Sequence, residues 1–423
     1  MTTPPATVTK TPSTRLDSID ALRGWVMVLM ALDHVRDYFS DFAGNPTDPA
    51  RASFAIFFTR WVTHFCAPTF VFLAGTGAFL YGQRGRSQSE LSRFLWTRGL
   101  WLVVLELTLV HWGWTFQPTI HSFEGQVIWA IGVSMILLAA LVHLPLHLLL
   151  ALAVLMIVGH NALDSVRFPP TDWRSGPWAV LHAGVFGNSP PLQLPGGLTF
   201  FPLYPLIPWV GVMAAGYAFG LVVQRPKAER IRWCVRAGIA SIAAFVVIRF
   251  SNLYGDPNPW TSQATFPRTV LSFLNCAKYP PSLLYLLMTL GPMFLLLAAM
   301  ESRSKAIPGS ATDSNNATES PTAARWVPQW LIVLGRVPMF YYLLHLYLAH
   351  LSAGIAMAVF RGKEHAAWIL HNGFWEDSRP AGYGIPLWGV YLAWITIVAL
   401  LYPACRWYAG LKQRSRNPLL SYL

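Results

Sequence analysis

The chain has 423 residues, of which 54% are hydrophobic and only 12% are charged. A soluble domain usually carries about 25% charged residues, so this composition excludes a disordered protein, a coiled coil and an ordinary soluble enzyme. The mean hydropathy of +0.41 and the 19 tryptophans indicate a protein that crosses a membrane several times. The net charge of +12 lies mostly between apolar runs. We therefore interpret it as a topology signal and expect no nucleic-acid partner.

A membrane-spanning helix needs about 20 mostly apolar residues. By this criterion the sequence predicts an all-α, polytopic integral membrane protein with about ten spans. They are 20–40, 54–82, 94–114, 125–142, 144–160, 200–223, 233–250, 281–300, 328–359 and 385–409. The fourth and fifth are short and close together, so a re-entrant hairpin is an alternative for them. The ninth is long enough to tilt or to break near 352–354.

The orientation follows from lysine and arginine, which are enriched on the cytoplasmic side of membrane proteins. Alternate segments between the predicted spans are rich in these residues, whereas the loop 115–124 has none. Both termini are therefore predicted to be cytoplasmic. The predicted inside segments include Arg84, Arg86, Arg93 and Arg98 after the second span, and Arg406, Lys412, Arg414 and Arg416 at the C-terminus.

The predicted organisation is a single transmembrane domain at 19–410 between two cytoplasmic tails. These tails are residues 1–18, which we expect to be flexible, and residues 411–423. Residues 302–326 are polar with few aromatic side chains, which indicates a flexible cytoplasmic loop. The outer loops 161–199 and 251–280 are rich in proline, glycine and tryptophan. Loops of this kind can form an ordered lid over an outward-facing cavity.

The first predicted span carries a cluster of ionisable residues, which are costly inside a bilayer. His34 lies about 16 Å beyond Arg23 along a helix axis, at 1.5 Å per residue, and therefore in the outer half of the helix. Asp33 and Asp37 bracket His34, and side chains three apart are neighbours on a helix. A nearby carboxylate orients a histidine ring and stabilises its protonated form, as a general base requires. The alternative is an interfacial histidine with solvated acids.

Further candidates lie in three other segments. His64 is four residues before Pro68, which can loosen a helix, so His64 is a candidate for lining a cavity. Lys278 and Ser282 flank two prolines at a helix start that favours anions, the alternative being an ordinary helix start with an interfacial lysine. His345 lies near the membrane middle, where a core histidine bonded to the backbone is the alternative to substrate binding. The histidines form no compact ligand set, so we expect no metal.

The start SIDALRGWVMVLMALDH resembles the first helix of the transmembrane acyltransferase superfamily. In this sequence the resemblance is carried by Asp20, Leu22-Arg23-Gly24 and His34. The segments APTFVFLAGTG, LNCAKYPPSLLYLLMTLGP and LGRVPMFYYLLHLYLAH resemble the bacterial branch related to heparan-α-glucosaminide N-acetyltransferase. The resemblance covers about residues 15–410, and the four segments in this order are considerably more specific than the first alone.

This resemblance implies helices around a central tunnel and transfer of an acyl group, commonly acetyl from acetyl-CoA, to a sugar across the membrane. It implies a location in the bacterial cytoplasmic membrane, with a carbohydrate or glycan acceptor, and leaves homodimer formation open. The superfamily's first-helix histidine maps onto His34. The lysosomal enzyme differs, because it has asparagine at the position of Asp33 and its essential histidine further into the next loop. One of its acidic residues aligns near His64, so the identity of the base stays open between the two histidines.

The leading hypothesis is therefore a membrane-bound O- or N-acyltransferase. The acceptor's amine or hydroxyl attacks the thioester, His34 removes the proton, and Asp33 or Asp37 holds the imidazolium. The transfer is either direct or passes through an acyl-histidine. The other expected groups are His64 as a further catalytic candidate and Lys278, Ser282, Arg23 and His345 as substrate-binding residues.

The alternative hypothesis is a proton-coupled transporter or exporter of a small polar solute. His34, His64 and His345 would then form a proton relay. The sequence shows neither an internal repeat nor paired broken helices at matching positions in two halves. Because many transporters carry such repeats, their absence from the sequence favours the enzyme.

Overall fold

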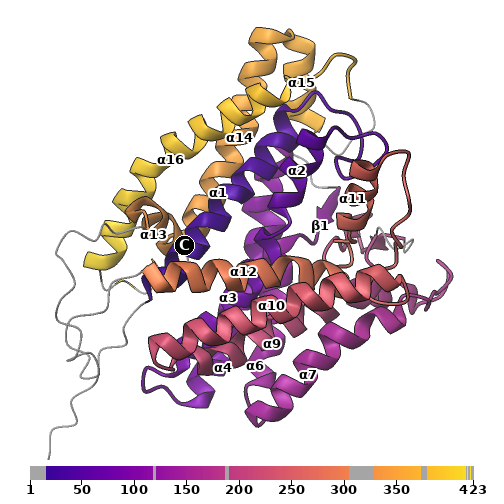
Figure 1. Cartoon of the computed structure of the whole chain (residues 1–423). Coiled ribbons are helices and arrows are strands. Elements are labelled where there is room, and N and C mark those ends of the chain that lie inside the picture. Colours follow the sequence, from indigo (N-terminus) through magenta and orange to yellow (C-terminus); the bar gives the residue numbers. More distant parts are fainter. Residues whose placement is uncertain are drawn as a thin grey trace, which may run out of the picture.

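The computed structural model is mostly helical and describes residues 16–117, 121–185, 190–303, 327–372, 379–415, 417 and 420 (Figure 1). The first half of the chain forms α1 (Asp17–Phe39), α2 (Phe54–Thr63), α3 (Cys66–Gly82), α4 (Gln88–Leu105), η1 (Glu106–Val110), α5 (His111–Thr115), α6 (Val127–Leu141), α7 (Leu146–Gly159), η2 (His160–Leu163), α8 (Ser175–Trp178), η3 (Ala179–Ala183) and α9 (Leu206–Val223). The second half forms α10 (Lys227–Ser251), α11 (Phe266–Leu274), α12 (Leu283–Arg303), α13 (Gln329–Arg336), α14 (Pro338–Phe360), α15 (Lys363–Asn372) and α16 (Leu387–Arg414).

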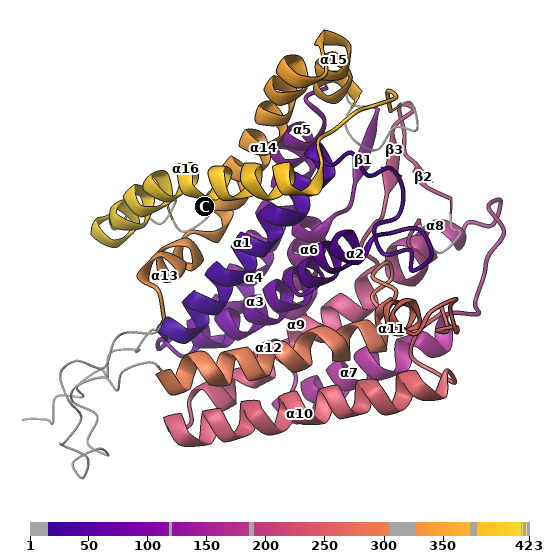
Figure 2. The same cartoon turned by 45° about the horizontal axis from the view of Figure 1, so that its top comes forward.

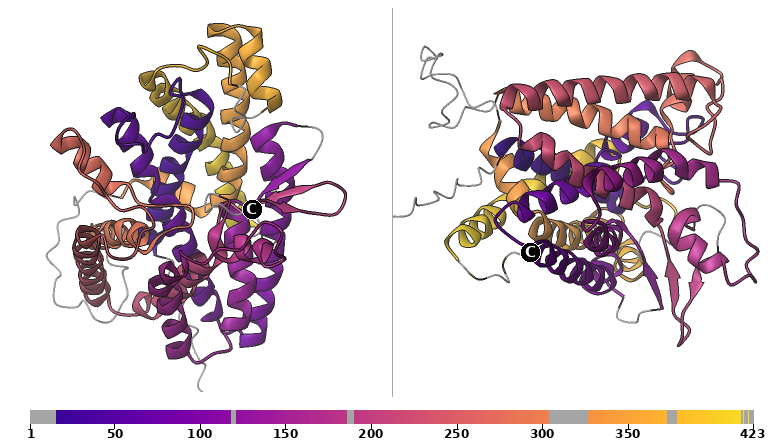
Figure 3. Two further views of the ribbon diagram at one scale, coloured as in Figure 1. Left: turned by 90° about the vertical axis from the view of Figure 1, so that its right-hand side faces the viewer. Right: turned by 90° about the horizontal axis from the view of Figure 1, so that it is seen from below.

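A small three-stranded sheet is the only one in the described part of the chain. It consists of β1 (Ser122–Glu124), β2 (Leu192–Gln193) and β3 (Thr199–Phe201). The central strand β3 runs parallel to β1 and antiparallel to β2. The sheet projects from one end of the helices (Figure 3), where it joins two of the predicted outer loops.

Eight helical segments of the described residues are long and apolar enough to cross a membrane. An all-α polytopic membrane protein is thereby confirmed, but the predicted count of about ten is not exact. The first predicted span does form a helix, α1, whose several charged residues keep it out of the eight. The fourth forms α6, which has only 15 residues. The fourth and fifth spans are separate helices, and each of them packs against α9.

The ninth predicted span breaks at its beginning and not near 352–354. Val337 separates α13 from α14, and Pro338 is the first residue of α14. Proline fits this position because the first N–H groups of a helix have no partner within it. Ser352 does not interrupt α14, which continues to Phe360, and its hydroxyl donates back to the carbonyl of Leu348 at 2.5 Å.

The helix α1 lies in the middle of the bundle, and most of its side chains are buried (Figure 2). It packs against α2, α3, α12, α13, α14 and α16. Its closest crossing is with α13. A Cβ atom at Gly24 would lie 1.9 Å from the carbonyl oxygen of Leu331, and one at Gly335 would lie 1.8 Å from that of Asp20. Only glycine therefore lets the two backbones touch at this crossing.

The two sides of the bundle differ. α1 begins and α16 ends on the same side, which we call the terminal side (Figure 2). The strands, α8, α11 and α15 lie on the other, which we call the loop side. The predicted flexible loop at 302–326 leaves from the terminal side after α12, but it lies almost wholly outside the described residues, as do most of the N-terminal tail and part of the C-terminal one.

The glycine crossing gives a stability prediction. We expect Gly24→Ala and Gly335→Ala each to destabilise the protein by about 1–3 kcal/mol, the usual cost of overpacking, because the added methyl group would meet a backbone carbonyl that cannot move freely. The measurement is the thermal unfolding midpoint of the detergent-purified protein.

Gly77→Ala in α3 is the matched control, because a Cβ atom there has no neighbour within 4 Å. Its midpoint should stay the same or rise slightly, as alanine is the better helix former. If all three variants unfold at one temperature, the close crossing of α1 and α13 is not what holds these helices together.

Candidate active site

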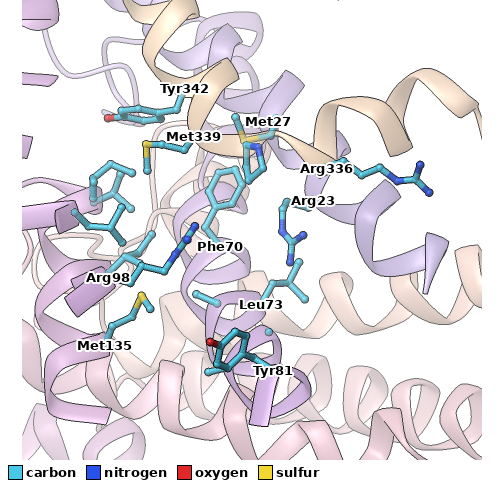
Figure 4. A pocket seen from close by; sticks show the side chains of 18 of the residues that line it. Arg23, Met27, Phe70, Leu73, Tyr81, Arg98, Met135, Arg336, Met339 and Tyr342 are labelled. Carbon is cyan, nitrogen blue, oxygen red and sulfur yellow. The ribbon is translucent and has the colours of Figure 1, made fainter. Parts of the chain in front are cut away.

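Two cavities lie end to end along α1. The first, which we call the basic cavity, has a volume of about 380 Å³ and is lined by Arg23, Met27 and Met30 from the first half of α1 (Figure 4). Its other walls come from α3, α4, α6, α14 and α16. The basic residues that line it are Arg23, Arg84, Arg98, Arg336 and Lys412. Of the two halves of the predicted tunnel, this is the one nearer the terminal side.

The second cavity, which we call the polar cavity, has a volume of about 840 Å³ and faces the loop side. The second half of α1 contributes Asp33, His34 and Asp37 to its lining. Polar side chains from elsewhere are Arg60, His64, Gln126, Asn258, Asn275, Lys278 and Arg379, and aromatic ones are Trp114, Tyr204, Tyr279, Trp368 and Tyr383. The predicted outer loop 251–280 supplies several of these residues, so it does form part of the wall of this cavity.

A pair of buried histidines stands between the two cavities. Nδ1 of His34 lies 2.7 Å from Nε2 of His345, and the two rings are nearly parallel. Nδ1 of His345 lies 3.0 Å from the carbonyl oxygen of Tyr341. A carbonyl can only accept, so Nδ1 of His345 must carry a proton, and in the neutral ring Nε2 is then the acceptor for Nδ1–H of His34. This chain of bonds leaves Nε2 of His34 as the atom with a free lone pair.

Aromatic rings close the junction around His34. The ring centroid of Trp114 lies 4.7 Å from that of His34, edge to face, and that of Tyr342 lies 6.1 Å away. Tyr342 lines the basic cavity, Trp114 and His34 line the polar cavity, and Val127 lines both. The predicted tunnel is thus divided at this histidine by a thin layer of side chains.

The two aspartates beside His34 are engaged elsewhere. Asp33 Oδ1 accepts from Arg36 at 3.0 Å and from Thr63 at 2.9 Å, and its other oxygen accepts from Arg60. Asp37 accepts from Arg36 at 2.5 Å. A buried carboxylate needs such partners, and these arginines outcompete a neutral imidazole for it. The hydrogen-bond partner of His34 in the structure is therefore His345, which the sequence analysis placed among substrate-binding residues. The catalytic roles expected for Asp33 and Asp37 stay predictions.

His64 lies at the break between α2 and α3 that Pro68 creates. Because proline has no N–H, the carbonyl of His64 has no helical donor at that position and instead accepts from the hydroxyl of Tyr285 at 2.8 Å. The His64 side chain lines the polar cavity, and its buried Nδ1 has no hydrogen-bond partner within the described part of the chain. His64 is thus placed on the cavity as predicted, but without the fixed tautomer that His34 has.

Lys278 and Ser282 have different positions although they are close in sequence. Lys278 lines the polar cavity, with its ammonium 5.1 Å from the ring centroid of Tyr279. Ser282 is fully buried and lines neither cavity; its hydroxyl donates to Asp256 at 2.6 Å and accepts from the N–H of Tyr285 at 3.0 Å. Ser282 therefore fastens the start of α12, and substrate binding by this residue stays a prediction.

Hydrogen bonds from the buried Arg249 side chain fix the backbone just before Lys278. This side chain is 1% exposed, and its guanidinium donates to the carbonyls of Phe273, Asn258, Ser272 and Asn275 at 2.8–3.1 Å. On the cavity face of the loop, burial raises the pKa of Tyr279, but the charges of Lys278 and Arg60 outweigh this effect and set the pKa below its ordinary value. The phenol of Tyr279 is therefore a stronger hydrogen-bond donor than usual.

The basic cavity was not foreseen as a site. Arg23, predicted to bind substrate, does line it, and it also bonds to Asp20 and to the carbonyl of Gly335, each at 3.3 Å. The sequence analysis used Arg84, Arg98 and Lys412 only to predict the orientation in the membrane. Their spacing in the sequence does not indicate that they line one cavity. Among the described residues, no group of three or more His, Cys, Asp or Glu side chains is placed to hold a metal ion.

The structure thus has two cavities on opposite sides of a buried histidine pair, a geometry that would let two molecules approach each other from opposite sides. The comparison with protein families agrees with this geometry. Residues 15–250 match the family described as heparan-alpha-glucosaminide N-acetyltransferase, catalytic. The match covers more than half of the chain, which therefore belongs to this family of membrane acetyltransferases. A comparison with curated proteins gives no significant match.

The pair of arginines that binds Asp33, Arg36 and Arg60, which we call the arginine clamp, gives a second prediction. Asp33→Asn would leave Arg36 and Arg60 buried without their shared carboxylate, and breaking such a buried pair costs about 3–5 kcal/mol. We expect a large fall in the thermal unfolding midpoint of the purified protein. Asp37→Asn should cost clearly less, because Asp37 is more exposed and bonds to Arg36 alone. Equal midpoints for the two variants would show that the clamp does not stabilise the fold.

Proposed function

We propose that this chain transfers an acetyl group from acetyl-CoA, bound in the basic cavity, to a hydroxyl or amine of a sugar in the polar cavity. The observation that carries the proposal is the position of His34, at the thin layer where the two cavities meet. A base at this point can serve a donor and an acceptor that never share one compartment. Membership of an acetyltransferase family supports the reaction type.

The basic cavity suits the donor. Its charged residues lie toward the terminal side, and phosphate groups bind well to arginine and lysine. Met27, Met30, Phe70, Met135 and Met339 add apolar surface to the wall of the same cavity. A CoA thioester has phosphates at one end and a long, weakly polar arm at the other, so its acyl group would reach the end of the cavity next to His34.

The polar cavity suits a carbohydrate acceptor. Specific small-molecule sites combine aromatic walls with a few polar groups that fix orientation, and here Trp368, Tyr383 and Tyr204 provide aromatic surfaces. Lys278 and Gln126 provide hydrogen-bond donors in the same cavity. We assign Lys278 to acceptor binding on this basis, as the sequence led us to expect.

The proposed reaction is direct transfer. The acceptor attacks the thioester carbonyl while Nε2 of His34 takes its proton, and the resulting imidazolium gives that proton to the departing CoA thiolate. His345 keeps Nδ1 of His34 protonated, so the lone pair stays at Nε2, on the cavity side. In this scheme His345 acts as a positioning residue, and His64 is the rival for the base.

The location we propose is the bacterial cytoplasmic membrane, with both termini in the cytoplasm. The described chain begins and ends on one side of the bundle (Figure 2). The basic cavity is lined by Arg23 near the start of α1 and by Lys412 near the end of α16. Acetyl-CoA is a cytoplasmic metabolite, so the positive-inside rule and the donor site agree on the same orientation. The acceptor would then be a glycan of the cell envelope.

The test is first a binding measurement. Acetyl-CoA at about 100 times its Kd should stabilise the purified protein by about 2.7 kcal/mol through mass action, which is seen as a higher unfolding midpoint. Arg98→Gln should weaken this effect, since Arg98 lines the basic cavity. No stabilisation at any concentration would remove the donor assignment and favour the proton-coupled transporter.

Activity is tested by comparing the envelope glycans of cells that express the wild type, His34→Ala or His64→Ala at equal levels. We expect an acetylated glycan that appears with the wild type and falls by about 10²- to 10⁴-fold with His34→Ala, the range for loss of a general base. Binding of acetyl-CoA should survive in His34→Ala. If His34→Ala acetylates normally while His64→Ala is inactive, the base is His64.

A further inference from the structure

Tyr342 occupies the inner end of the basic cavity. Figure 4 shows it at the opposite end from Tyr81, with Met339 and Phe70 between them. The side chain is 3% exposed, and its ring centroid lies 5.5 Å from that of His345 and 6.1 Å from that of His34. A group that enters this cavity from the terminal side therefore meets Tyr342 just before it reaches the histidine pair.

The hydroxyl of Tyr342 donates to no acceptor among the described residues. Buried hydroxyls nearly always have a partner, because leaving the O–H without an acceptor costs free energy. A phenol that lacks one, yet lines a cavity beside the candidate base, is placed to donate to something that enters the cavity. Tyr342 can also donate without rearranging, which is the property that makes a hydrogen-bond donor useful in a transition state.

We propose that Tyr342 donates its hydrogen bond to the carbonyl oxygen of the acyl thioester and stabilises the oxyanion formed during transfer. This inference rests on the proposed acetyltransferase function. As the acceptor's nitrogen or oxygen bonds to the carbonyl carbon, the π electrons of the C=O bond move onto the oxygen, which Tyr342 holds. The acceptor's proton goes to Nε2 of His34. The C=O bond then re-forms, the C–S bond breaks, and the thiolate takes the proton from His34.

Tyr341 is a matched control supplied by the chain itself. It directly precedes Tyr342 in α14 and is fully buried, and its hydroxyl likewise has no hydrogen-bond partner among the residues that the structure describes. It lines neither cavity. Tyr341→Phe therefore shows how the loss of a buried phenol oxygen affects the fold, while the proposed acetyl-CoA site stays unchanged.

The first experiment measures the bound donor and needs no acceptor. Acetyl-CoA labelled with ¹³C at the carbonyl is bound to the full-length protein in detergent, and its carbonyl stretching band is recorded by infrared difference spectroscopy. A phenol donor lowers this frequency. We expect Tyr342→Phe to return the band toward its value in an apolar solvent, and Tyr341→Phe to leave it as in the wild type. An identical band in all three proteins would overturn the proposal.

The second experiment measures turnover as thiol release from acetyl-CoA with glucosamine as the probe acceptor. Tyr342→Phe should lower kcat by about 10²- to 10³-fold, as the loss of one oxyanion donor does, with little change in the KM for acetyl-CoA. The unfolding midpoint of Tyr342→Phe should match that of the wild type. For Tyr341→Phe, both kcat and the unfolding midpoint should match those of the wild type. Normal kcat in Tyr342→Phe would contradict the role. Wild-type protein that neither binds nor cleaves acetyl-CoA would overturn the proposed function instead.

Discussion

The hydrogen bond between His34 and His345 is the constraint on which the candidate site depends. Its polarity is set by a backbone carbonyl, that of Tyr341, which can only accept and so fixes the proton positions along both imidazoles. The bond joins α1 to α14 across the middle of the bundle. A small shift of one helix along the other would break this hydrogen bond. Nδ1 of His34 would then no longer be held protonated, and the free lone pair would no longer be fixed at Nε2.

The packing around α1 explains how that alignment is kept. Gly24 and Gly335 bring α1 and α13 into backbone contact, and Pro338 restarts the chain as α14 directly after that contact. On the opposite half of α1, Asp33 binds Arg60 of α2. A buried ion pair contributes little net stability, but it is very costly to separate. The same aspartate thus holds the first two helices together and stays unavailable to His34.

The sequence predicts the fold class and much of the site because both have local signals. Apolar runs show the helices, and the spacing from Arg23 to His34 places the histidine in the outer half of α1. Pro68 correctly marks the break at His64. The partnership of His34 with His345 has no such signal, since 311 positions separate them and single-sequence patterns do not report which helices pack. Ser282 carries a genuine helix-start signal, but the structure uses it to bind Asp256.

The arginines show why one sequence pattern can have two meanings. A positive charge near a helix end is enriched in the cytoplasm whether or not it binds a ligand, so Arg84 and Arg98 look like topology signals alone. In the folded chain they lie with Arg23 and Arg336 around one cavity, because α1, α3, α4 and α13 all have ends on the terminal side. In the function that we propose, the charges that predict a cytoplasmic terminal side also surround the cavity to which we assign the acyl-CoA donor. The proposed orientation and the proposed donor site then depend on the same residues, so evidence against the orientation would also count against the donor site.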